Sequence, residues 1–181
     1  GDVVLENVRM DASALKRLKR ICLIACGTSY HAALVGKHLL EGLCRLPVEV
    51  DLGSEFRYRD PLVDPQTLLI CISQSGETAD TRAGLTAGKE LGAKTLAIVN
   101  AVGSSIAREA ASVFYTHAGP EIGVASTKAF TCQLAVFACL ALALGRARGV
   151  LTREQERELV AELIATPGQM AEELSREVQI E

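Results

Sequence analysis

The sequence predicts an α/β protein, a three-layer αβα sandwich with a five-stranded parallel sheet between two helical layers. Two observations support this fold class. Short apolar runs alternate with helix-like stretches along most of the 181-residue chain. The apolar runs are continuous rather than alternating, which is typical of strands covered on both faces. Alternation of strands and helices favours parallel strands joined by right-handed crossovers.

The elements are expected in a regular order after a lead-in segment, residues 1–20. The expected strands are residues 21–26, 48–53, 67–73, 95–100 and 112–118. The expected helices are residues 29–43, 78–91, 104–110, 125–147 and 153–164. Residues 54–66, which are polar and contain two prolines, connect the second strand to the third and are expected to start with one helical turn.

Residues 151–181 are expected to form a helical extension beyond the sheet. Thr152 and Gln155 have the spacing of a capping box at a helix start. Pro167 and Gly168 break the helical pattern, so we expect two helices in this extension. The whole chain, residues 1–181, has a length that suits one domain.

Composition excludes several classes of protein. The net charge is −3, and residues 152–181 carry −5 of it, so the remaining body at +2 gives no reason to expect nucleic acid or a membrane surface as partner. The apolar stretch 134–145, "LAVFACLALALG", is shorter than a membrane span and is expected to be a buried helix.

The cysteines and the missing motifs point to a protein without a metal or cofactor. The six cysteines form no CxxC pair and have no histidine at metal spacing, so we expect reduced thiols in a cytoplasmic protein. The three histidines are scattered and are expected to be structural. The sequence has neither a G-x-x-x-x-G-K-[ST] loop nor a G-x-G-x-x-G turn after the first strand, which argues against a nucleotide site.

Two hydroxyl-rich turns are the candidate ligand site. Residues 26–29, "CGTS", follow the first strand, and residues 73–78, "SQSGET", follow the third. In a flavodoxin-like strand order, 2-1-3-4-5, these two turns meet where the order reverses, which is where ligands bind in open parallel sheets. Each turn also leads into a helix amino terminus, which favours an anion. One such turn would be explained by helix capping, but two together favour a phosphate ligand.

A third polar stretch, residues 119–133, runs from a glycine- and proline-containing loop into the long apolar helix. It is either a loop followed by a helix that Ser126 caps, or a lid over the two turns. Its Glu121, and Glu77 in the second turn, are the only carboxylates near the expected site. Both are expected to be structural.

Three motifs in this order and spacing, "CGTS", "SQSGET" and "EIGVASTKAFT" (121–131), resemble the glucosamine-6-phosphate synthase family, the isomerising glutamine–fructose-6-phosphate aminotransferases. "SEFRYR" (54–59) and "NAVGSS" (100–105) are similar too. The resemblance runs from about residue 4 to the end and is to the first of two sugar isomerase (SIS) domains. It implies that the substrate phosphate is held by Ser29, Ser73, Gln74, Ser75 and Thr78, with Gly27, Thr28, Val124, Ala125 and Ser126 completing the substrate-binding set against the sugar.

The resemblance also implies partners and a missing activity. The family's enzyme makes glucosamine 6-phosphate from fructose 6-phosphate and glutamine, and needs a glutaminase domain and a second SIS domain. Its catalytic residues lie in those parts, so this chain is expected to have no catalytic residue and to bind without turnover. The apolar helix 125–147 implies a homodimer. Two alternatives remain: a stand-alone sugar-phosphate sensor, and a single-SIS-domain isomerase that uses Glu77 or Glu121.

Overall fold

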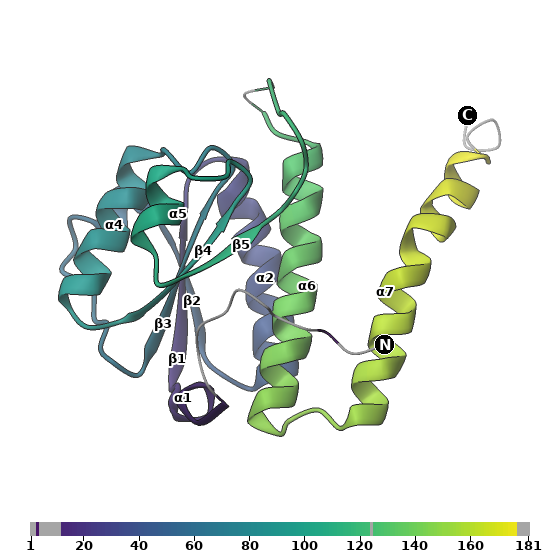
Figure 1. The fold of residues 1–181 in the computed structure, drawn as a ribbon, viewed down its shortest axis with the longest axis horizontal. Helices are drawn as coiled ribbons and strands as arrows, with labels where there is room; N and C mark the ends of the chain where they lie inside the picture. The colour runs from purple at the N-terminus through teal and green to yellow at the C-terminus, as the bar shows by residue number, and fades with distance from the viewer. Residues whose placement is uncertain (1–2, 4–11, 124, 177–181) are drawn as a thin grey trace.

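The computed structural model describes residue 3 and residues 12–123 and 125–176. Its sheet has five parallel strands in the order β2-β1-β3-β4-β5 (Figure 1). This topology confirms the α/β prediction and the expected reversal of strand order between β1 and β3. The strands are β1 (Arg20–Ala25), β2 (Val48–Leu52), β3 (Thr67–Ser73), β4 (Lys94–Val99) and β5 (Ser112–Tyr115).

Helices cover both faces of the sheet (Figure 1). One face packs against α2 (Thr28–Cys44) and α6 (Lys128–Arg148), and the other against α3 (Gly53–Phe56), α4 (Ala79–Glu90) and α5 (Ser105–Glu109). Within β1, Ile21 and Leu23 belong to the first core cluster, whereas Cys22 and Ile24 belong to the second. Because both faces of the strand are buried, its apolar run is continuous rather than alternating.

Most element boundaries shift by a few residues from the sequence-based expectation, and the lead-in and the end of β5 are two clear differences. The lead-in contains a short helix, α1 (Ala12–Arg17), held by Arg148, whose Nη1 donates to the carbonyl oxygens of Leu15 and Leu18 at 2.8 and 3.2 Å. Strand β5 ends at Tyr115 rather than at residue 118, because His117 has a φ of 51° that a strand does not allow.

The extension after the sheet is one helix, α7 (Arg153–Leu174), and the expectation of two helices is wrong. Pro167 lies inside α7, where its missing N–H removes a single backbone hydrogen bond and the helix continues on both sides. The capping box is confirmed, since Gln155 N donates to Thr152 Oγ1 at 3.2 Å and Thr152 N donates to Gln155 Oε1 at 2.9 Å.

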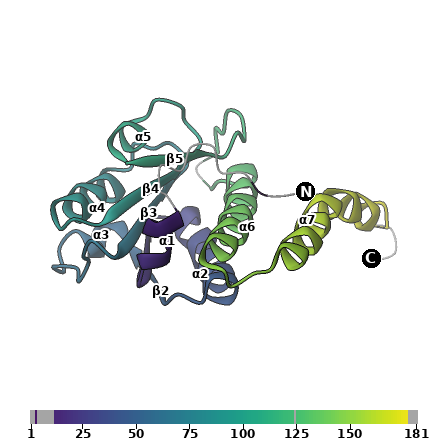
Figure 2. The ribbon, with the colours of Figure 1, turned by 60° about the horizontal axis from the view of Figure 1, so that its bottom comes forward.

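Helix α7 touches the body of the protein mainly near its start. Val160 and Leu151 pack on Leu142 of α6, and Arg146 pairs with the buried Glu156 at 2.9 Å. The distal half of α7 extends away from the sandwich in both views (Figures 1 and 2). Its apolar side chains Ile164 and Leu174 are 71% and 70% exposed, so this half has no packing partner among the described residues.

Helix α6 is the central helix of its layer. The ring of Phe137 on α6 packs closely against α2. A Cβ on Gly36 of α2 would lie 2.6 Å from this ring, so only glycine fits at that position. Helix α6 has 21 residues, and its most apolar 18-residue window has a mean hydropathy of 1.7, so by length and composition alone it could span a membrane. Buried helices of folded domains can have the same composition. Because α6 packs along α2 and the sheet, its buried apolar side chains are explained by the core of this domain.

All six cysteines are free, as expected from their spacing. Cys22 and Cys44 lie in the core, where burial raises the pKa of each thiol to about 12. Such thiols remain protonated and behave as small apolar side chains.

Candidate functional site

The two hydroxyl-rich turns line one cavity of about 220 Å³ at the carboxyl ends of β1 and β3. Eight of the ten residues expected at the site line it together with two others. The lining residues are Cys26, Gly27, Thr28, Ser29, Ser73, Gln74, Ser75, Thr78, Gly123 and Ser126. Sequence reasoning therefore located the cavity but missed Cys26 and Gly123, which directly adjoin expected residues in the chain.

Of the remaining two expected residues, Ala125 is not part of the described lining. Ala125 lies beside Ser126 in the loop before α6 and is exposed. Val124 lies outside the described residues, so its prediction stands without a structural test.

The turn after β3 is held together by its own hydroxyls. Ser73 Oγ accepts from the backbone N–H of Gly76 at 3.0 Å and lies 2.9 Å from Thr78 Oγ1. Thr78 is the N-cap residue of α4, yet its side chain makes no capping hydrogen bond. Because one hydroxyl of this pair must donate to the other, Ser73 and Thr78 together can offer one hydroxyl hydrogen to a ligand.

Gly76 makes this turn possible. Its φ is 66°, in the left-handed region, and a Cβ at this position would lie 2.0 Å from Ser104 Oγ. Its carbonyl oxygen also accepts from the N–H of Ile106 at 3.0 Å, which ties the turn to α5. Glycine is therefore required by both the backbone conformation and the close approach of Ser104.

Ser75 is the most accessible hydroxyl of the turn. Its Oγ accepts from the backbone N–H of Glu77 at 3.2 Å, and the side chain is exposed at the cavity. Since that contact uses a lone pair, the hydroxyl hydrogen stays available to a ligand. The amide of the neighbouring Gln74 also lines the cavity and can donate to an anion.

The turn after β1 adds further donors to the same cavity. Gly27, with a φ of 58°, is the N-cap of α2, and Thr28 and Ser29 form the first turn of that helix. Ser29 is 6% exposed, and its Oγ accepts from Gln133 Nε2 of α6 at 3.0 Å. The first N–H groups of a helix have no partner inside the helix, so they favour an anion at this wall.

The loop before α6 forms the third side of the cavity through Gly123 and Ser126. Ser126 Oγ donates to Glu121 Oε2 at 3.1 Å, and the N–H of Ala129 donates to the same oxygen at 3.3 Å. Thr127, not Ser126, is the N-cap of α6. Because the hydroxyl hydrogen of Ser126 is used by Glu121, Ser126 can only accept a hydrogen bond from a ligand.

The two nearby carboxylates are both engaged by backbone groups. The N–H of Ser105 donates to Glu77 Oε1 at 2.8 Å and lowers the pKa of Glu77. The N–H of Ala129 lowers the pKa of Glu121 in the same way. Both groups therefore stay ionised at neutral pH, so neither can act as a general acid, and the lowered pKa makes each a weaker general base.

The hydroxyl and amide side chains that line the cavity are neutral, and all but Ser126 have a hydrogen to donate, the Ser73–Thr78 pair having one between them. No lysine or arginine belongs to the described lining, and no group of three or more histidine, cysteine or acidic residues in the described ranges could hold a metal ion. Hydroxyls, an amide and helix N–H groups can surround a phosphate without a cation.

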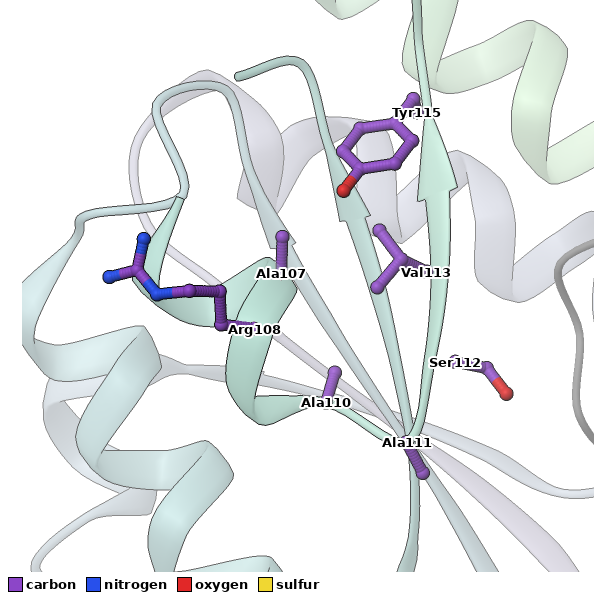
Figure 3. A pocket seen from close by; sticks show the side chains of 7 residues that line it. All are labelled: Ala107, Arg108, Ala110, Ala111, Ser112, Val113 and Tyr115. Atoms are coloured by element: carbon purple, nitrogen blue, oxygen red, sulfur yellow. The ribbon is translucent and has the colours of Figure 1, made fainter. Parts of the chain in front are cut away.

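A larger cavity of about 310 Å³ lies at the sheet edge between α5 and β5 (Figure 3). Its lining consists mostly of small side chains together with Tyr115 and Arg108, and Figure 3 shows that Arg108 points away from Tyr115. The guanidinium of Arg108 donates to the carbonyl of Gly103 and to Ser105 Oγ. The larger volume therefore does not make this cavity the better candidate for a ligand site. The number of uncommitted donors favours the cavity at the carboxyl ends of β1 and β3, which is the switch point where the strand order reverses.

The fold and the cavity at its switch point define the class of protein. Residues 14–143 match the model of the SIS domain, so the chain belongs to the SIS domain family.

Within this class, the chain is similar to glutamine–fructose-6-phosphate aminotransferases (isomerizing). It is 50% identical to the Clostridium tetani enzyme over 166 residues and 52% identical to that of Bacteroides thetaiotaomicron over 174, which are 92% and 96% of this chain. Among solved structures, the C-terminal domain of glucosamine-fructose-6-phosphate aminotransferase from Francisella tularensis superposes with a TM-score of 0.92 at 37% identity over 99% of this chain. The resemblance to this enzyme family that was inferred from the motifs is confirmed.

The chain is short compared with these relatives. It spans 27% and 28% of the two curated enzymes and 51% of the Francisella tularensis chain. The similarity therefore concerns one SIS domain and not the whole enzyme.

Proposed function

We propose that this chain is the first SIS domain of an isomerising glutamine–fructose-6-phosphate aminotransferase and holds the phosphate of fructose 6-phosphate or glucosamine 6-phosphate in the switch-point cavity. The observation that carries the proposal is the convergence of uncommitted donors from two turns, after β1 and β3, on one cavity of about 220 Å³. Helix capping does not account for the hydroxyls of these turns, because the N-cap residues of α2 and α4, Gly27 and Thr78, make no side-chain capping hydrogen bond.

The hydrogen-bond pattern suggests a division of roles. Ser29, Ser75, Gln74 and the Ser73–Thr78 pair each have a hydrogen to donate and would bind phosphate oxygens. Ser126 can only accept, so it would face a sugar hydroxyl. Gly27, Thr28, Val124 and Ala125 complete the expected contacts of the sugar.

The proposed partners follow from the length of the relatives. Since the chain spans about a quarter of the curated enzymes, we propose that a glutaminase domain and a second SIS domain complete the active enzyme. No cofactor is proposed. The engaged carboxylates of Glu77 and Glu121 support a binding role without catalysis.

The isolated 181-residue chain is expected to bind glucosamine 6-phosphate without producing it. Titration calorimetry should detect binding with a dissociation constant of about 0.1–1 mM, equivalent to about 4–5.5 kcal/mol. Coupled assays with fructose 6-phosphate and ammonia should show no product. Turnover by the purified chain would instead favour the single-domain isomerase, with Glu77 or Glu121 as its base. Binding by this chain, together with a gene that encodes a DNA-binding domain beside it, would favour the sensor.

The chain is also expected to form a homodimer. Helix α6 is apolar nearly all round but is only partly buried, and α2 beside it exposes Leu34 and Val35 by 38% and 42%. Apolar area left at a helical layer favours association with another copy. Sedimentation velocity over a range of concentrations tests this, and a species that stays monomeric at high concentration would refute it.

A further inference from the structure

A buried amide behind the cavity contacts one of its hydroxyls. Gln133 lies on α6, is 1% exposed, and donates from Nε2 to Ser29 Oγ at 3.0 Å across 104 residues of sequence. Ser29 in turn lines the cavity at the first turn of α2. Gln133 itself is not part of the lining, so any effect on a ligand must pass through Ser29.

The direction of this hydrogen bond decides what Ser29 can do. A serine hydroxyl has one hydrogen to donate and two lone pairs to accept. Because Gln133 Nε2 occupies a lone pair of Ser29 Oγ, the hydroxyl hydrogen remains free to donate into the cavity. A residue that accepted from Ser29 would instead remove this hydrogen from any anion bound there.

Stability does not explain a glutamine at this position. Gln133 Oε1 is buried and has no hydrogen-bond partner among the described residues. A buried polar atom without a partner is destabilising, and an apolar side chain of similar volume would avoid that cost. An unfavourable group kept in a core indicates a role outside folding.

We propose that Gln133 is a positioning residue that orients the Ser29 hydroxyl so that its hydrogen points to a phosphate oxygen of the bound sugar phosphate. This inference rests on the proposed function of the cavity. Helix α6 also carries the loop with Ser126 at its amino terminus, where Glu121 ties that loop to Ala129. Through Gln133 the same helix fixes Ser29, so α6 sets the position of two sides of the cavity.

The test is a double-mutant cycle in the 181-residue chain with Gln133→Met, Ser29→Ala and the double variant. Methionine has nearly the volume of glutamine but no donor. Titration followed by NMR measures affinity for glucosamine 6-phosphate even in the millimolar range, and thermal unfolding without ligand measures stability. Leu142→Ala, a buried position on the same helix nine residues away, is the control for a simple loss of packing.

Gln133→Met is expected to weaken binding by about five- to tenfold, the effect of one net hydrogen bond, while the melting temperature without ligand stays equal or rises. In the Ser29→Ala background it should change affinity by less than about twofold. Leu142→Ala should lower the melting temperature and leave affinity unchanged.

Three results would overturn the inference and leave the proposed function intact. One is unchanged affinity in Gln133→Met while the unmodified chain binds. The second is an equal loss of affinity in both backgrounds. The third is a loss of affinity that accompanies a lower melting temperature, as in a structural defect. Failure of the unmodified chain to bind glucosamine 6-phosphate would overturn the proposed function and this inference together.

Discussion

Replacing Ser75 with alanine is expected to weaken binding of glucosamine 6-phosphate by about ten- to a hundredfold or more, because a hydrogen bond to a charged phosphate contributes about 1.5–3 kcal/mol. Ser75 keeps its hydroxyl hydrogen uncommitted, since its Oγ accepts from Glu77 N. The loss of that local contact at an exposed residue should cost about 1 kcal/mol of stability at most. Titration and thermal unfolding of the same variant measure both effects.

The matched control is Thr86→Val on α4. Thr86 is also exposed and its hydroxyl donates to a backbone oxygen, that of Arg82, at 3.2 Å, but it does not line the cavity. This variant should retain affinity. If Ser75→Ala lowers the melting temperature and leaves affinity unchanged, the hydroxyls after β3 serve the fold and not a ligand.

Replacing Gly76 with alanine is expected to give the largest loss of stability, about 2–5 kcal/mol. Part of the loss comes from the φ of 66°, which an alanine adopts at a cost of about 1–2 kcal/mol. The rest comes from the added Cβ, which would lie 2.0 Å from Ser104 Oγ and 2.5 Å from Ser104 Cβ. For a chain of this size the melting temperature should fall by roughly 5–15 °C.

Gly103→Ala separates these two causes. Gly103 has a φ of 72°, but a Cβ there meets nothing within 4 Å, so this variant should show the backbone cost alone. The double variant Gly76→Ala, Ser104→Gly should recover the remainder, because it removes the side chain that clashes. Ser104 Oγ has no hydrogen-bond partner in the described residues, so its removal loses little else. Equal melting temperatures for Gly76→Ala and Gly103→Ala would contradict the close approach of Ser104.

The sequence by itself determined the layers, the strands and the place of the cavity. Continuous apolar runs identify strands buried on both faces, and β3 was predicted with its observed bounds, Thr67–Ser73. The capping box of Thr152 and Gln155 was read from spacing, because both partners lie within one helical turn. Hydroxyls after β1 and β3 predicted the cavity, since parallel strands bring their carboxyl ends to one edge.

Only the tertiary structure decided which of these hydroxyls are free. The partner of Ser29 is Gln133, which packing of α6 on α2 brings to 3.0 Å across 104 residues, and no local pattern encodes that contact. The hydroxyl of Ser126 is used by Glu121, although spacing suggested a helix cap. Helix α7 continues through Pro167 where the pattern predicted a break. Periodicity and turn chemistry act over a few neighbouring residues, whereas the hydrogen-bonding state of a hydroxyl depends on whichever side chains the packed helices bring to it.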